Sequence, residues 1–84
     1  MSVEEIRGQI QTITNGLLKQ KGLPQVVLID ETPFLGGKLS IDSLDLAVVV
    51  TELQRVTKVD PFKEGFRNFR TVGELARLYA EAAE

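Results

Sequence analysis

The chain has 84 residues, of which 43% are hydrophobic and 26% are charged, and its formal net charge is −2. A chain of this length forms one hydrophobic core, so a multidomain enzyme is excluded and residues 1–84 are expected to form a single domain. Because Cys and His are absent, disulfides and Cys/His metal sites are excluded, and the usual general base near neutral pH is missing. No metal site is expected, and an independent enzyme is disfavoured.

Charge and hydropathy also limit the partners and the location of the protein. The chain has no Lys/Arg-rich run, which argues against nucleic-acid binding. No apolar run approaches the roughly 20 residues of a membrane span, and the N-terminal segment carries acids where a secretory signal would be basic. We therefore expect a cytoplasmic protein with no membrane span.

The N-terminal segment predicts an amphipathic helix. Ser2 and Glu5 have the spacing of a capping box, so the helix should begin there, and Gly22 and Pro24 should end it. Apolar residues recur along one face at helical spacing. They are Val3, Ile6, Ile10, Ile13 and Leu17.

A long loop is predicted from Leu23 to Ile41, because Pro24, Pro33 and adjacent glycines interrupt its apolar patches. Its β-branched run could form a strand, but the sequence offers no second run with which that strand could pair. We expect apolar side chains of the loop to anchor it to the core. These are Val27, Ile29, Phe34 and Leu35.

A second helix is predicted over residues 43–57, with apolar residues at helical spacing on its inward face. They are Leu46, Val49, Val50, Leu53 and Val56. Residues 42–60 contain four acids and two bases, so this segment carries the whole net charge of −2. Ordinary helix capping and a solvated face would explain these charges without any function.

A short third helix is predicted after the cap Asp60–Pro61. Phe62, Phe66 and Phe69 would share one side of it, although Gly65 should weaken it.

The last predicted helix begins at a second capping box, formed by Thr71 and Glu74. Its inward face contains Val72, Leu75, Ala76, Leu78, Tyr79 and Ala82. The predicted fold is therefore an all-α four-helix bundle with a long loop between the first two helices and a short third helix.

Ser43 is the candidate for chemistry, since it alone of the three serines lies where the long loop meets a helix. Free N–H groups and the positive end of the helix dipole would stabilise a phosphodiester on its hydroxyl, whereas Asp42 and Asp45 would disfavour a free anion. From these residues alone, Ser43 is either a modification site of this kind or a structural N-cap, which is a common role of serine.

The segment Asp42–Ser43–Leu44–Asp45–Leu46 resembles the Asp-Ser-Leu attachment motif of acyl carrier proteins, which bear 4′-phosphopantetheine on the serine at the start of their second helix. The segment Phe69–Arg70–Thr71–Val72–Gly73–Glu74–Leu75 is similar to the one that opens the last helix of that family. Length, acidic net charge and helical layout agree with the family over nearly all 84 residues.

The resemblance implies a carrier that performs no catalysis itself. A phosphopantetheinyl transferase would attach 4′-phosphopantetheine from coenzyme A to Ser43, and the thiol of that arm would hold an acyl group as a thioester. Asp42 would help to position the transferase, and Leu44 would give partners an apolar contact. Apolar residues of the second helix would either line a cavity for the acyl chain or simply pack the core. These are Leu46, Val49, Val50 and Leu53.

The expected partners besides the transferase are acyl-activating enzymes, acyltransferases or ketosynthases of fatty-acid, lipid or polyketide-type synthesis, and the carrier is expected to be a monomer. Partners would contact Asp45 and an exposed stripe, the docking stripe, on the second helix. The stripe consists of Leu44, Ala47, Val48, Thr51 and Arg55. Carriers of general fatty-acid synthesis usually keep this face acidic, whereas here Val48 and Arg55 interrupt it. We therefore expect weak electrostatic steering, docking through apolar contact, and a specialised carrier.

Other functions remain compatible with these residues. An aminoacyl or peptidyl carrier would use the same attachment chemistry with a different cargo. An unmodified helical adaptor would bind partners through the docking stripe alone. An enzyme that uses Ser43 with Lys38 as its base is a third reading, although the chain offers little room for a pocket.

Overall fold

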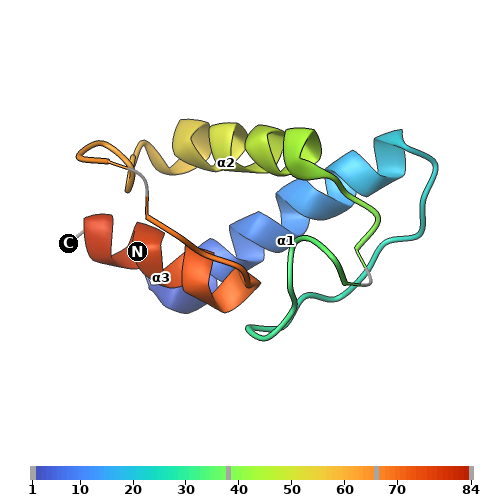
Figure 1. The fold of residues 1–84 in the computed structure, drawn as a ribbon, viewed down its shortest axis with the longest axis horizontal. Helices are drawn as coiled ribbons and strands as arrows, with labels where there is room; N and C mark the ends of the chain where they lie inside the picture. Colours follow the sequence, from blue (N-terminus) through green and yellow to red (C-terminus); the bar gives the residue numbers. More distant parts are fainter. Residues whose placement is uncertain (1, 38, 66, 84) are drawn as a thin grey trace.

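The computed structural model describes residues 2–37, 39–65 and 67–83. It contains α1 (Val3–Gln20), α2 (Ser43–Thr57) and α3 (Val72–Ala82), and α1 packs against both other helices (Figure 1). Within these residues there is no β-strand, and none of the helices is long and apolar enough to cross a membrane. The all-α prediction is confirmed, but the predicted fourth helix is not among the elements described.

The first helix begins at the predicted capping box. The Glu5 N–H donates to Ser2 Oγ at 3.1 Å, and the Ser2 N–H donates to Glu5 Oε1 at 3.0 Å. The helix ends before Gly22, because the φ angle of Gly22, 74°, is incompatible with a right-handed helix. Its buried face differs in part from the predicted one, since Leu18 is buried where Leu17 is only half-buried. The buried residues are Ile6, Ile10, Thr14 and Leu18.

The loop between α1 and α2 is held by other side chains than those predicted. Phe34 is buried as expected, but Val27 is 80% exposed and Ile29 is 56% exposed, and Leu28 between them is buried. Leu35 is exposed as well, and Leu39 is buried instead. Successive side chains of an extended segment point to opposite sides, so a shift of one residue reverses which of them reach the core.

Side-chain amides of α1 fix this register. Asn15 Oδ1 accepts from the Val26 N–H at 2.8 Å, and Asn15 Nδ2 donates to the Val26 carbonyl at 2.8 Å. Gln11 Oε1 accepts from the Leu28 N–H at 2.8 Å. The loop backbone is therefore hydrogen-bonded to side chains of α1 and not to a neighbouring strand. These hydrogen bonds orient the side chain of Leu28 toward the core.

The same loop is fastened to the start of α3. The Phe34 N–H donates to the Arg70 carbonyl, the Val72 N–H to the Thr32 carbonyl and the Gly73 N–H to the Asp30 carbonyl, each at 2.9 Å. Arg7 of α1 also forms an ion pair with Asp30 at 2.6 Å. Both α1 and the start of α3 thus support the loop that leads to Ser43.

The described residues between α2 and α3 do not form the predicted short third helix, because the chain makes consecutive turns over residues 61–64. Asp60 Oδ1 accepts from the Phe62 N–H at 3.0 Å, which bends the chain into a turn instead of starting a helix. Gly65, at φ 132°, then leaves helical conformation. Phe66 lies outside the described residues.

Aromatic rings connect this segment to the core without a helix. Phe69 packs edge-on against Phe34 with ring centroids 5.8 Å apart, and Phe62 lies 6.0 Å from Phe69 and 6.4 Å from Tyr79. Tyr79 donates its hydroxyl to the Val50 carbonyl of α2 at 3.2 Å. These contacts join α2, α3 and the segment between them.

The last helix begins at its predicted capping box, in which the Glu74 N–H donates to Thr71 Oγ1 at 3.2 Å. Its inward face is buried as expected, except that Ala82 is exposed near the end of the helix. In α2 the last of the predicted core residues along the helix, Val56, is likewise exposed, at 37%.

Candidate functional site

Ser43 is the first residue of α2, and Asp42 before it is the N-cap. Asp42 Oδ1 accepts from the Asp45 N–H at 2.9 Å, and Asp45 Oδ2 accepts from the Asp42 N–H at 3.2 Å. This reciprocal pair is a capping box made by two aspartates. The reading of Ser43 as a structural N-cap is therefore wrong, because Asp42 has that role.

The Ser43 side chain is accessible to solvent. It is exposed, and its hydroxyl makes no hydrogen bond with any described residue. It stands at the N-terminus of a 15-residue helix, where free N–H groups and the positive end of the dipole favour a phosphodiester. An exposed hydroxyl in this position fits a phosphate-linked group.

A lysine from the end of α1 also reaches this first turn, which the sequence analysis did not foresee. Lys21 forms an ion pair with Asp45, and its Nζ lies 3.5 Å from the Ser40 carbonyl oxygen. The hydrogen bond from Lys21 and the one from the Asp42 backbone hold the pKa of Asp45 below its ordinary value. Asp42 makes no ion pair with any described residue.

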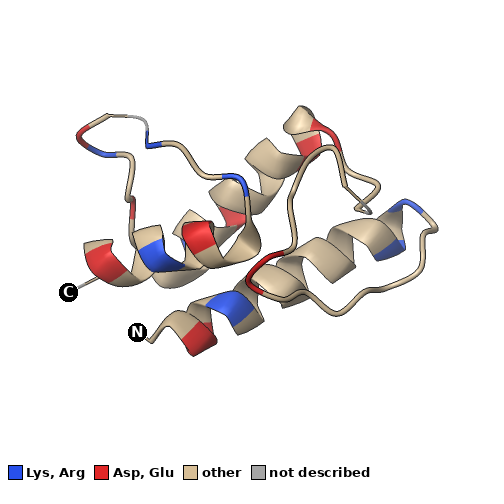
Figure 2. Cartoon of the chain, turned by 60° about the horizontal axis from the view of Figure 1, so that its bottom comes forward, with Lys and Arg blue, Asp and Glu red and all other residues tan. Residues whose placement is uncertain are grey.

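The docking stripe is exposed along its whole length, as predicted. Leu44 is 77% exposed and Val48 is 48% exposed, so both present apolar surface to solvent. Arg55 forms a forked pair with Glu52, at 2.9 Å for the shorter contact, and that hydrogen bond lowers the pKa of Glu52. Acidic and basic residues are interspersed along the chain (Figure 2). Within the stripe, Leu44 and Val48 present apolar surface, and the charge of Arg55 is paired with Glu52.

The four residues expected to line an acyl cavity do not share one pocket. Val49 and Leu53 are fully buried in the core, and Val50 is half-buried and accepts the Tyr79 hydrogen bond. Leu46, one turn after Ser43, lines a pocket of about 460 Å³. Its other lining residues are Pro33, Phe34, Leu35, Phe69 and Arg70.

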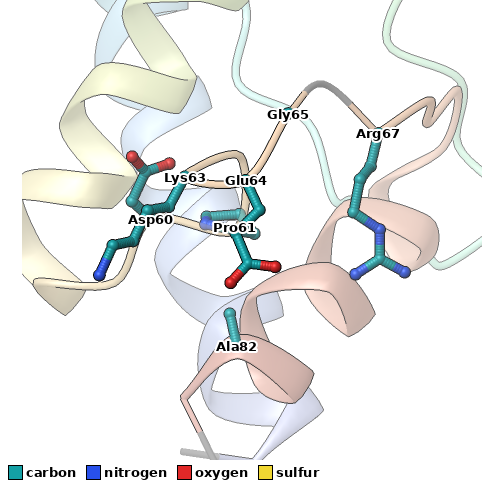
Figure 3. A pocket seen from close by; sticks show the side chains of 7 residues that line it. All are labelled: Asp60, Pro61, Lys63, Glu64, Gly65, Arg67 and Ala82. Atoms are coloured by element: carbon teal, nitrogen blue, oxygen red, sulfur yellow. The ribbon is translucent and has the colours of Figure 1, made fainter.

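A second pocket, of about 510 Å³, lies beyond the other end of α2 (Figure 3). It is lined by Asp60, Pro61, Lys63, Glu64, Gly65, Arg67 and Ala82. Since α2 has 15 residues and rises about 1.5 Å per residue, this pocket is roughly 20 Å from Ser43 and does not belong to the same site.

Metal binding and serine-based catalysis would each depend on particular side chains. Among the residues that the structure describes, no group of three or more acidic side chains could hold a metal ion. Lys38, the candidate base for an enzyme, lies outside them.

Comparison with known proteins identifies the family of the chain. No family model and no curated protein matches the chain. The chain is similar to the solution structure of MacpD, an acyl carrier protein from Pseudomonas fluorescens involved in mupirocin biosynthesis. The two share 31% sequence identity at a TM-score of 0.83, over 94% of this chain and 71% of that one. The chain therefore belongs to the acyl carrier protein family.

Proposed function

We propose that this protein carries acyl groups on a 4′-phosphopantetheine arm attached to Ser43 and presents them to partner enzymes. The observation that carries the proposal is the exposed Ser43 hydroxyl, without a hydrogen bond to the described residues, on the first residue of α2. A serine that capped the helix would have its hydroxyl engaged, but here Asp42 caps the helix and leaves the hydroxyl available.

The residues around Ser43 fit the attached group. The first N–H groups of α2 would hold the phosphodiester, and Asp42, with no ion pair to a described residue, would orient the transferase. When bound, the arm supplies the thiol that forms the thioester, which this Cys-free chain lacks. The chain's own work is to position the attachment point and to dock the partners, so the protein is a non-catalytic carrier.

Docking would use the docking stripe and, within the limit set by its ion pair with Lys21, Asp45. Leu44 and Val48 offer the apolar contact, while Ala47, Thr51 and Arg55 surround it with small or polar groups. Glu52 already pairs with Arg55, so little net charge remains for long-range steering. Contact should therefore depend on apolar area more than on charge.

The pocket beside Leu46 would shelter the part of the acyl chain nearest to the arm, since Leu46 follows Ser43 by one helical turn. Val49, Val50 and Leu53 continue along α2 into the core. They would line a longer cavity only if α2 moved away from α3, which would break the hydrogen bond between Tyr79 and Val50.

The pathway we propose is a dedicated synthesis of fatty-acid, lipid or polyketide type, served by acyl-activating enzymes, acyltransferases or ketosynthases. The apolar docking stripe supports a specialised carrier, and the similarity to MacpD, whose pathway is mupirocin biosynthesis, supports the same view. An aminoacyl or peptidyl cargo would use the same site.

The test is the intact mass of the protein after incubation with coenzyme A and a broad-specificity phosphopantetheinyl transferase. Wild type should gain one phosphopantetheinyl group, and Ser43→Ala should gain none. Ser40→Ala is the matched control and should be modified like wild type. If folded wild type gains no mass with its cognate transferase either, the carrier function fails and an unmodified adaptor becomes the better reading.

A further inference from the structure

The ammonium group of Lys21 joins the two segments on either side of Ser43. It pairs with Asp45 inside the first turn of α2 and lies 3.5 Å from the carbonyl oxygen of Ser40 in the segment that leads into the helix. Asp45 Oδ2, the oxygen that pairs with Lys21, also accepts from the Asp42 N–H at 3.2 Å. The residue that directly follows α1 thus contacts the turn that presents Ser43.

The ion pair between Lys21 and Asp45 neutralises only one of the two carboxylates beside Ser43. The Asp45 side chain is 17% exposed and faces the lysine, whereas Asp42 is exposed and makes no ion pair with a described residue. One ammonium and two carboxylates leave this turn with a formal charge of −1, where the sequence of α2 alone would suggest −2. A cationic docking group therefore meets one uncompensated carboxylate.

Resting on the proposed carrier function, we infer that Lys21 is a specificity-determining residue: by pairing with Asp45 it withdraws one carboxylate from the docking surface, and so disfavours partners that dock through a dense basic patch. Glu52 is withdrawn in the same way by Arg55. Partners with an apolar docking face, which use Leu44 and Val48, are favoured in comparison.

The experiment measures the binding of a hexaarginine peptide, a probe of basic docking faces, by NMR titration of the backbone amides of residues 42–45. Lys21→Met removes the ammonium group but keeps a side chain of similar length. Its Kd should be about threefold lower than that of wild type at about 20 mM salt, since one uncompensated charge about 6 Å from the probe contributes that much in water. The difference should vanish at about 500 mM salt.

Lys19→Met is the matched control, because Lys19 lies in the last turn of α1 two residues before Lys21, is exposed, and makes no ion pair with a described residue. It removes the same charge without freeing Asp45, so its Kd should stay within about 1.5-fold of wild type. Adding Asp45→Asn to Lys21→Met should return the Kd to the wild-type value. Equal Kd values for wild type and Lys21→Met, or equal gains in both lysine variants, would overturn the inference.

A second readout is independent of the peptide and separates charge from stability. The pKa of Asp45, followed by carboxyl NMR, should rise in Lys21→Met and stay unchanged in Lys19→Met. A lysine with a merely structural role would lower the melting temperature and leave the affinity for the peptide and its salt dependence as they are. Neither readout requires modification of Ser43, so a failure here is distinct from a failure of the carrier function.

Discussion

Gly73, in the first turn of α3, lies against Asp30 of the loop between α1 and α2. A methyl group added at Gly73 would lie 2.7 Å from Asp30 Cβ, 3.0 Å from its Cγ and 3.1 Å from its Cα. The Gly73 N–H also donates to the Asp30 carbonyl at 2.9 Å. Any shift that relieves the clash therefore lengthens the hydrogen bond that fastens the loop.

These contacts give the magnitude expected for Gly73→Ala. Overpacking at a well-fitted contact costs about 1–3 kcal/mol, and weakening the hydrogen bond costs about 1 kcal/mol more. The better helix propensity of alanine returns about 1 kcal/mol. The free energy of unfolding should thus fall by about 1–3 kcal/mol, and each kcal/mol lowers the melting temperature of a domain of this size by about 4–8 °C.

Urea unfolding followed by circular dichroism measures this change, and Gly8→Ala is the matched control. Gly8 lies inside α1, and a methyl group there would meet nothing within 4 Å. Its replacement should raise the free energy of unfolding by about 1 kcal/mol, because only the propensity changes. If Gly73→Ala were as stable as wild type, the close fastening of the loop to α3 would be refuted.

Three further outcomes are expected. Val48→Asp should weaken the native partner about tenfold, because it buries a charge in an apolar contact, whereas Val48→Ala should have a small effect; a steep loss of wild-type binding with added salt would instead indicate electrostatic docking. The single tyrosine, Tyr79, should titrate with a pKa of about 12 when followed by ultraviolet absorbance, because burial raises its pKa. The stability that its protonated form contributes should therefore be lost as the pH rises from about 10 to 12. A midpoint near 10 in the folded protein would contradict its burial. The pKa of Asp45 is lowered mainly by the hydrogen bond from Lys21, and that of Glu74 mainly by backbone N–H groups. The contribution of these two carboxylates to stability should be complete above pH 5 and lost as the pH falls below about 4. Midpoints of urea unfolding measured between pH 3 and 7 would reveal this loss.

Local signals in the sequence predicted the helices well. The boxes at Ser2 and Thr71 depend on side chains three residues apart, so they are legible in the sequence alone, and both are present. The start of α2 at Ser43 was predicted from the apolar periodicity of residues 43–57 instead. Its cap, Asp42, has the same spacing to Asp45, and this signal could have excluded Ser43 as the cap before the structure was known.

Contacts between distant residues could not be read in this way. The register of the loop depends on Asn15 and Gln11 of α1, which lie 11 and 17 residues from the backbone groups that they bind. The spacing of Phe62 and Phe69 suits a helix, but their rings pack against Phe34 and each other from turns and irregular chain instead. Pattern alone does not separate these two ways of burying the same rings.

In the candidate site, too, features set by local sequence were predicted and contacts between distant residues were not. The exposure of the docking stripe follows from helical periodicity and was predicted, as was the position of Ser43 at the start of the helix. The contact between Lys21 and Asp45 spans 24 residues and was missed, although it sets the charge beside Ser43. The pocket next to Leu46 was missed for the same reason, because most of its lining comes from Phe34, Phe69 and their neighbours outside α2.

The most direct test of the account is to locate the modification within the chain. After incubation with coenzyme A and a phosphopantetheinyl transferase, fragmentation of the intact protein in the mass spectrometer assigns the added group to one of the three serines, Ser2, Ser40 or Ser43. The account predicts a single phosphopantetheinyl group on Ser43, with Ser2 and Ser40 unmodified. A group on either of the other serines, or a folded protein that its cognate transferase leaves unmodified, would contradict it.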